Sequence, residues 1–384
     1  MHHDSDASPT VKPTESPDHF SKLDADLILS AAESSGLRST GRFQQLNSME
    51  NRVYAVEVED PAQPRGVGQI IIKFYRPQRW SPAMLVSEHA LLRLLAEENI
   101  ETPALIPIVE QSFVHSEAGT LRQKLRGDLP SGFPTTPTLG CVGDFAFAIW
   151  KKIYGRVPLE LEEKDLIGIG RTIARMHNLF ERHVDVEKFV RPRFSLDMYV
   201  HTPLKSLVEW NKVPQQFSNG IFQLIENIGR GLEWLPEADV FIPVHGDLHR
   251  LNLVQMSEGG QFWFVDFDDC QYGLAMQDLW PLASTCGCAV PEHLEDVTPS
   301  AYALGMLTQG YRDFRALPAD WEIFVEPLRT LKMIHYIGWI AGRWSDPFFR
   351  QTFSFFEDVD YWEKTYFDLA DQQQSLIAQG CLEF

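Results

Sequence analysis

Residues 245–252 read His-Gly-Asp-Leu-His-Arg-Leu-Asn, and Phe-Val-Asp-Phe-Asp follows at 264–268. Asp247 and Asn252 lie five positions apart, and Asp266 ends an apolar run. Phosphoryl transfer from ATP uses one carboxylate to orient the acceptor hydroxyl, while an Asn and a second carboxylate hold Mg²⁺ against the phosphates. Asp247 and Asn252 also suit an ordinary turn or cap, but the complete spacing favours phosphoryl transfer. The stretch therefore predicts Asp247 as the catalytic residue and Asn252 and Asp266 as Mg²⁺ ligands.

The polar residues around this motif have more than one interpretation. Asp268 is an extra carboxylate that either stays solvated or helps to bind a second metal ion. We expect His245 to hold the loop by bonding to the backbone, and His249 either to meet the transferred phosphoryl group or to be a plain polar loop residue. Asp278 lies in a mostly apolar segment, where a buried carboxylate needs partners. It is expected to brace the loop through backbone amides, to cap the following helix, or to do both.

A nucleotide site also needs a cation for the phosphates, and Lys73 follows the β-branched run 70–72. A Lys in such a strand either extends to the surface or meets an anion in a cleft. Glu88 lies further along, in the first turns of a predicted helix. Kinases hold the phosphates with a strand Lys that is paired with a helix Glu. Taken with the loop motif, Lys73 and Glu88 support a nucleotide site.

The turn at residues 46–52 (Leu-Asn-Ser-Met-Glu-Asn-Arg) occupies the place of a phosphate-covering loop, although no Gly-x-Gly-x-x-Gly is present. Ser48, Asn51 and the backbone amides there are able to donate hydrogen bonds to phosphate. An ordinary polar hairpin turn explains the composition equally well. The chain also lacks the Gly-x-x-x-x-Gly-Lys-Ser/Thr motif, so a P-loop enzyme is not supported.

Strand patterns precede helical patterns along this chain. Ser81 suits a helix cap and Pro82 the first helical position. Beyond residue 150, apolar residues recur at helical spacing. Alternating or β-branched apolar residues predict strands at 51–58, 68–74, 106–114 and 145–150. Strands first and helices later predict an α+β fold with two lobes.

We expect a small β-rich N-lobe at residues 20–150 and a larger, mostly helical C-lobe at 151–384. Residues 1–19 are polar and contain Pro, which predicts a disordered tail. Residues 116–140 are rich in Gly, Pro, Thr and charge, which predicts a long loop.

The bulk composition excludes several classes of function. The chain has 384 residues and a formal net charge of −19, which disfavours nucleic-acid binding through phosphate neutralisation and contact with an anionic membrane. Five scattered Cys do not form a disulfide framework, and no apolar stretch suits a membrane helix or signal peptide. We therefore expect a cytoplasmic protein, and a monomer.

Several segments together resemble one known family. The chain is similar to the aminoglycoside phosphotransferase and choline kinase branch of the protein-kinase-like superfamily, and within it to the bacterial stress response kinase A group. The similarity runs from about residue 20 to residue 365, and residues 334–346 fit as well. The segments that carry it are LNSMENRVYAV, IIKFYRPQRW, VHGDLHRLNLV, FVDFDD and MQDLWPL.

This resemblance implies a bilobal kinase fold, the use of ATP and Mg²⁺, and phosphorylation of Ser or Thr in proteins, the chain itself included. It implies the roles given above for Asp247, Asn252 and Asp266, and it adds Ser48 as a nucleotide-site residue. Lys73 and Glu88 match the phosphate-holding pair of the superfamily. The group acts in survival under stress. Two features depart from the group: the loop at 116–140 is longer than expected, so the resemblance does not define the upper rim of the ATP cleft, and the acidic N-terminal tail is extra.

Three functions follow from these observations. The first is a Ser/Thr protein kinase of the stress-response type. The second is a small-molecule kinase acting on an amino alcohol, sugar or aminoglycoside, because the same loop serves both and a fold does not fix its substrate. The third is a non-catalytic binding protein, against which the intact Lys73, Asp247, Asn252 and Asp266 argue.

Overall fold

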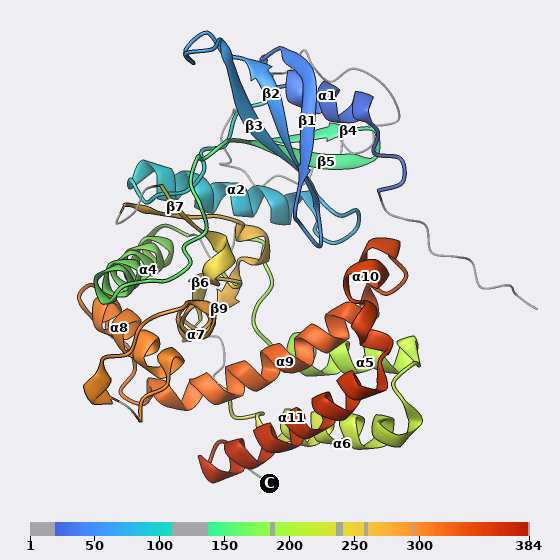
Figure 1. The fold of residues 1–384 in the computed structure, drawn as a ribbon, viewed down its shortest axis with the longest axis vertical. Coiled ribbons are helices and arrows are strands. Elements are labelled where there is room, and N and C mark those ends of the chain that lie inside the picture. The colour runs from blue at the N-terminus through green and yellow to red at the C-terminus, as the bar shows by residue number, and fades with distance from the viewer. Residues whose placement is uncertain are drawn as a thin grey trace, which may run out of the picture.

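The chain folds into two lobes, a five-stranded antiparallel sheet and a larger, mostly helical part (Figure 1). The α+β prediction is therefore confirmed. The expected tail at 1–19 and most of the expected loop at 116–140 lie outside the described residues. The computed structural model describes residues 20–109, 137–184, 189–235, 241–256, 260–294 and 296–382.

The N-lobe sheet has the strand order β1-β2-β3-β5-β4. The strands predicted at 51–58 and 68–74 are confirmed as β2 and β3, which pair antiparallel in a hairpin from Arg52 opposite Phe74 to Glu59 opposite Val67. Two further ladders, β6 with β9 and β7 with β8, lie in the larger lobe. The strands are β1 (Ser39–Leu46), β2 (Arg52–Glu59), β3 (Val67–Phe74), β4 (Leu139–Val142), β5 (Phe145–Lys151), β6 (Ile242–Val244), β7 (Leu253–Gln255), β8 (Phe262–Phe264) and β9 (Gln271–Gly273).

Two predictions for the segment before β5 need correction. Residues 106–109 form no strand, since in the described residues this segment has only the isolated bridge of Leu105 to Trp150 and single backbone hydrogen bonds. Of the β-branched residues at 106–109, Ile108 is buried by packing and Val109 is exposed. The predicted loop also ends too late, because Leu139–Val142 is the edge strand β4.

The predicted helix at Ser81 is confirmed, since the Ser81 hydroxyl accepts from Met84 N and Asn99 follows its end with a positive φ of 53°. None of the helices in the described residues combines the length and apolar character that crossing a bilayer requires. The α-helices are α1 (Ala25–Glu33), α2 (Pro82–Glu97), α4 (Glu163–His183), α5 (Thr202–Trp210), α6 (Gln215–Gly231), α7 (Met276–Thr285), α8 (Pro299–Arg312), α9 (Val325–Gly342), α10 (Pro347–Thr352) and α11 (Val359–Ala378).

The two faces of the N-lobe sheet pack differently, because successive side chains of a strand point to opposite faces. One face of β3 places Ile70, Ile72 and Phe74 in a small apolar core that α1 covers. The other face carries Ile71 and Lys73 toward the larger lobe and α2. In Figure 1, α2 lies between the sheet and the helical lobe.

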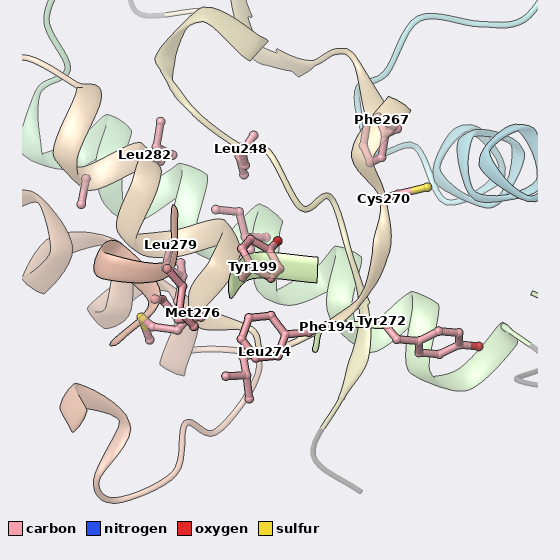
Figure 2. Close-up of a cluster of buried hydrophobic side chains, with 14 of the residues drawn as sticks. Phe194, Tyr199, Leu248, Phe267, Cys270, Tyr272, Leu274, Met276, Leu279 and Leu282 are labelled. Atoms are coloured by element: carbon pink, nitrogen blue, oxygen red, sulfur yellow. The ribbon is translucent and has the colours of Figure 1, made fainter. Parts of the chain in front are cut away.

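The large apolar core anchors the loop at 245–252 through Leu248. Leu248 is fully buried in this core with Leu279 and Leu282 of α7 (Figure 2). Because Leu248 is the direct neighbour of Asp247, the apolar core fixes the backbone that presents the Asp247 carboxylate.

Candidate active site

The loop that follows β6 is fixed by one buried carboxylate. Asp278 accepts hydrogen bonds from His245 N at 2.8 Å and Gly246 N at 2.9 Å. His177 Nε2 lies 3.0 Å from the Asp278 carboxylate, so this buried charge has three partners. The expected brace is confirmed. The alternative of a helix cap is wrong, because α7 begins at Met276 and Asp278 lies inside its first turn.

His245 and Gly246 set the path of the loop. His245 Nε2 lies 3.0 Å from the carbonyl oxygen of Val265, which is the expected bond to the backbone. Gly246 has a φ of +82°, and a Cβ at this position would lie 2.2 Å from the carbonyl oxygen of Asp269. Glycine therefore lets two loops approach where any side chain would separate them.

Asp247 lies between two basic side chains. Its Oδ1 is 2.8 Å from Lys332 Nζ, and its Oδ2 is 3.4 Å from His249 Nε2. Burial acts to raise the pKa of the Asp247 carboxyl, but Lys332 and His249 outweigh it and hold the pKa well below its usual range. Asp247 is therefore a carboxylate at neutral pH, suited to accept a hydrogen bond from a hydroxyl group.

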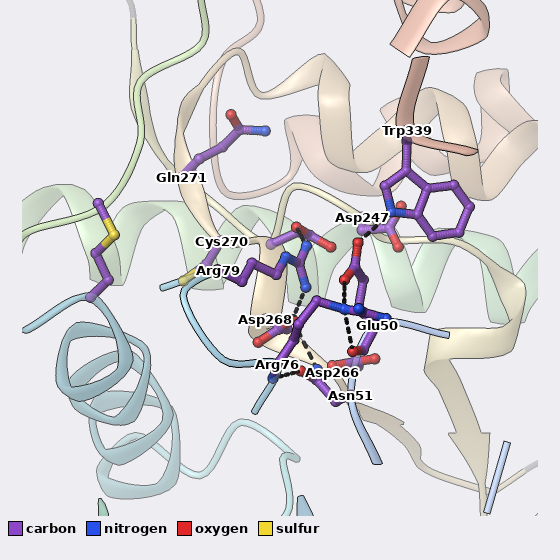
Figure 3. A network of polar contacts seen from close by, with 12 residues as sticks. Glu50, Asn51, Arg76, Arg79, Asp247, Asp266, Asp268, Cys270, Gln271 and Trp339 are labelled. Carbon is purple, nitrogen blue, oxygen red and sulfur yellow. Dashed lines mark hydrogen bonds and ion pairs between the residues drawn. The ribbon is translucent and has the colours of Figure 1, made fainter. Parts of the chain in front are cut away.

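Asn252 and Asp266 lie beside this loop, at one end of the β7–β8 hairpin. Asn252 Nδ2 donates to the carbonyl oxygen of Asp247 at 2.9 Å. The carbonyl oxygen of Asn252 accepts from Val265 N at 3.0 Å, which brings Asp266 next to the same end. Asp266 has a φ of +64°, an unusual backbone conformation for a residue with a side chain. The structure thus brings the three predicted residues into one region (Figure 3 labels Asp247 and Asp266).

Lys73 connects the sheet to this region. Its Nζ lies 2.8 Å from Asp266 Oδ1 and 3.7 Å from Glu88 Oε1. Burial acts to lower the pKa of Lys73, but the surrounding carboxylates outweigh it and hold the pKa well above its usual range. Burial also raises the pKa of Glu88 to about 7, although Lys73 acts against it. The predicted pairing of Lys73 with Glu88 is present, and Asp266 is a closer partner of Lys73.

Asp268 is buried and already has strong partners. Its Oδ2 accepts from Asn51 Nδ2 at 3.0 Å and contacts the guanidinium of Arg79, which also contacts Asp269. Burial acts to raise the pKa of Asp268, but Arg79 and Lys73 outweigh it and lower the pKa to about 2. Asp268 is therefore not a solvated carboxylate, and a role at a second metal ion stays a prediction.

The turn at residues 46–52 is tied to the larger lobe through Glu50. This buried carboxylate lies 2.7 Å from Arg76 Nε and 3.0 Å from Arg343 Nε, and Trp339 Nε1 donates to it (Figure 3). Burial acts to raise the pKa of Glu50, but Arg79, Arg343 and Arg76 outweigh it and lower the pKa. Both lobes therefore contribute to one buried set of charges.

Arg76 and Asp346 complete this set. Arg76 Nη2 lies 2.8 Å from Asp346 Oδ2, and Asp346 caps α10 by accepting from Phe348 N. Asn51 Oδ1 accepts from Arg76 N at 3.0 Å. We call the following residues the interlobe polar network: Glu50, Asn51, Arg76, Arg79, Asp268, Trp339, Arg343 and Asp346.

Sequence reasoning placed Ser48 in the turn between β1 and β2, and the structure has it there, partly exposed. The same reasoning missed Lys332, Glu50, Arg79 and Arg343. A signal existed for Arg79 and Arg343, which lie inside the mostly apolar segments 70–80 and 334–346, while Glu50 lies in a polar turn and does not stand out. No comparable pattern marks Lys332.

The residues present fit a magnesium ion. Asn252 offers an amide oxygen and Asp266 a partly exposed carboxylate, and such hard oxygen ligands are what Mg²⁺ takes from proteins alongside substrate phosphates. In the described residues, Asp268 Oδ1 is a buried oxygen that accepts no hydrogen bond. The site therefore has oxygen donors and a compensating cation, Lys73, within the same region.

Known proteins are similar in sequence to this chain over most of its length. The model of the phosphotransferase enzyme family matches residues 42–317. Stress response kinase A of Escherichia coli (strain K12) is 25% identical over 346 residues, which cover 89% of this chain and 90% of that protein. The Serine/threonine protein kinase RdoA of Salmonella typhimurium is 23% identical over 90% of this chain and 91% of that protein.

Solved structures share the fold. Amicoumacin kinase hAmiN, in complex with AMP-PNP, Ca²⁺ and Ami, superposes with a TM-score of 0.62 and 18% identity, covering 88% of this chain and 94% of that one. A microcompartment-associated aminopropanol kinase superposes with a TM-score of 0.60 and 18% identity, covering 94% of this chain and 99% of that one.

Proposed function

This chain belongs to the phosphotransferase enzyme family, and we propose that it transfers the γ-phosphoryl group of ATP to the hydroxyl group of Ser or Thr in proteins. The family membership makes it a phosphotransferase. Its relatives of near-equal length are named as stress response kinases and as a serine/threonine protein kinase. The proposal concerns the acceptor, the metal ion and the residues that act.

Asp247 would orient the acceptor hydroxyl and take its proton late in the transfer. The depressed pKa of Asp247 suits this role, because a loose phosphoryl transition state asks mainly for placement and charge neutralisation. Lys73 is kept charged by its carboxylate neighbours and would bind the phosphates. Glu88 would hold the Lys73 ammonium group in place. Asn252 and Asp266 would hold Mg²⁺, which supplies positive charge against the phosphate oxygens when bound. Ser48 would donate to the nucleotide from the turn above.

One observation carries the preference for a neutral hydroxyl over an amino alcohol or aminoglycoside. The carboxylates around Asp247 already have basic partners: Asp247 has Lys332, Asp266 has Lys73, and Asp269 has Arg79. An amino alcohol or aminoglycoside carries ammonium groups, which need carboxylates of their own when bound. A neutral Ser or Thr side chain makes no such demand. The paired charges therefore favour a neutral acceptor over a cationic one.

The test is label transfer from γ-labelled Mg-ATP to generic protein acceptors and to the chain itself. We expect labelled Ser or Thr with the wild type and a loss of at least about 100-fold with Asp247→Asn. Asp320→Asn, an exposed Asp before α9, is the matched control and should keep full activity. ATP turnover stimulated by an amino alcohol, sugar or aminoglycoside, with no protein labelling, would establish a small-molecule kinase instead.

A further inference from the structure

Lys332 is the closest charged partner of the catalytic carboxylate, and the motif that defines the site does not contain it. Its Nζ lies 2.8 Å from Asp247 Oδ1, although the two residues are 85 positions apart. The family match ends at residue 317, so it assigns nothing to Lys332. The residue two positions after Asp247 is His249, so the loop itself places no Lys there.

The helix that carries Lys332 is held firmly. Its neighbours Leu331 and Ile334 are fully buried in the large core. At Gly338 on the same helix, a Cβ would lie 2.3 Å from Pro203 Cα, so the backbones of α9 and α5 are in close contact. A rigid helix with a fixed neighbour can present an ammonium group with the accuracy that catalysis requires.

The pair is only partly covered, which distinguishes it from a buried structural ion pair. The Lys332 side chain is 40% exposed and that of Asp247 is 28% exposed. Because water reaches both side chains and screens their charges, the pair contributes little to stability. The contact on the other oxygen, from His249 at 3.4 Å, is longer and therefore easier for an acceptor to displace. The geometry leaves Asp247 Oδ2 as the oxygen that meets the acceptor.

We propose that Lys332 is a positioning residue for phosphoryl transfer: it holds Asp247 through Oδ1, so that Oδ2 receives the acceptor hydroxyl. The inference rests on the proposed function, but it holds for any hydroxyl acceptor. In the transfer, the acceptor oxygen bonds to the γ-phosphorus while the bond from that phosphorus to the β–γ bridging oxygen breaks. The electron pair of the broken bond leaves with ADP, and the hydroxyl proton passes to Asp247 Oδ2 and from there to water.

The test compares Lys332→Met and Lys332→Arg with Arg329→Met, a control on the same helix whose partner is the neighbouring Glu326. We expect Lys332→Met to lower kcat by about 10- to 100-fold and to leave KM for ATP within about 2-fold, because Lys332 acts on the acceptor side. Lys332→Arg should recover part of the loss. All three variants should keep the thermal stabilisation that Mg-ATP gives the wild type, since that readout reports binding and not transfer.

A double-mutant cycle decides whether Lys332 acts through Asp247. In the Asp247→Asn background, Lys332→Met should change the residual kcat by less than about 2-fold. An equal loss in both backgrounds, an unchanged kcat in Lys332→Met alone, or a loss confined to KM for ATP would each overturn the inference. Failure of the proposed function gives a different result, namely a wild type without transfer or an Asp247→Asn variant that keeps it.

Discussion

The two faces of the N-lobe sheet differ in the side chains that they carry. The face covered by α1 is apolar, and residues such as Ile72 and Phe74 are fully buried there. The face toward α2 carries Lys73, whose partners Glu88 and Asp266 come from other elements. One face holds the sheet together and the other holds charges in place. We therefore expect that stability and activity depend on different residues in this lobe, and the following substitutions test that expectation.

The largest effect should come from the charged face. Lys73→Met removes the cation that we expect to bind the phosphates, and it should lower kcat/KM for ATP by at least about 100-fold. Steady-state kinetics with the labelled acceptor measures this loss. Lys22→Met is the matched control, because Lys22 is exposed and, among the described residues, its ion pair is with the exposed Asp144. Equal losses in both variants would contradict the assignment of Lys73.

The apolar face should respond in the opposite way. Ile72→Ala opens a cavity in the small core, and it should lower the free energy of unfolding by about 3 kcal/mol, with about 1 kcal/mol for Ile72→Val. Urea unfolding followed by circular dichroism measures both. The kcat of the folded fraction should stay within about 2-fold of wild type. If the variant loses most of its kcat while it is fully folded, the apolar face contributes to activity as well as to stability.

Substitutions in the interlobe polar network should affect both stability and activity, because the network has residues from both lobes. Glu50→Gln removes the anion shared by Arg76 and Arg343, and we expect a loss of about 2 kcal/mol of stability. The turn that carries Ser48 should also loosen, so KM for ATP should rise. Thermal unfolding and kinetics measure the two effects. The control is Glu59→Gln, at the exposed end of β2, which is expected to change neither the stability nor KM for ATP.

The smallest effect is a change in pH dependence next to Glu88. His89 is fully buried and lies 3.0 Å from the Tyr75 hydroxyl, and burial lowers the pKa of His89 to about 3. Between about pH 3 and the unfolded value near 6.5, the unfolded chain therefore binds one more proton at this residue. Its contribution to stability is present above about pH 6.5 and is lost as the pH falls through that window.

His89→Gln should remove this dependence. Between about pH 4 and pH 6, the slope of unfolding free energy against pH should be less positive in the variant by about 1.4 kcal/mol per pH unit. Urea unfolding at a series of pH values measures the slopes. Identical slopes for the variant and the wild type would mean that His89 is protonated inside the fold.

Local patterns in the sequence predicted much of this molecule, and distant partners account for the rest. Asp247 and Asn252 belong to one short loop, and Lys73 lies in a strand whose β-branched run is visible in the sequence, so these residues could be predicted. Lys332 and Arg343 meet Asp247 and Glu50 across 85 and 293 positions. No periodicity in the sequence encodes such contacts, because they depend on how whole elements pack. For the same reason residues 106–109 of the predicted strand at 106–114 form no strand: β-branched residues favour a strand locally, but a strand also needs a partner strand.

The most direct measurement concerns the metal ion, because the account depends on Asn252 and Asp266 acting together beside Asp247. Mn²⁺ is the probe, and electron paramagnetic resonance reports its binding in the presence of a non-hydrolysable ATP analogue. We predict that Asp266→Asn and Asn252→Ala each weaken Mn²⁺ binding by at least about 10-fold, while Asp247→Asn lowers transfer by at least about 100-fold and leaves Mn²⁺ binding within about 2-fold. Unchanged Mn²⁺ binding in the first two variants would contradict the account.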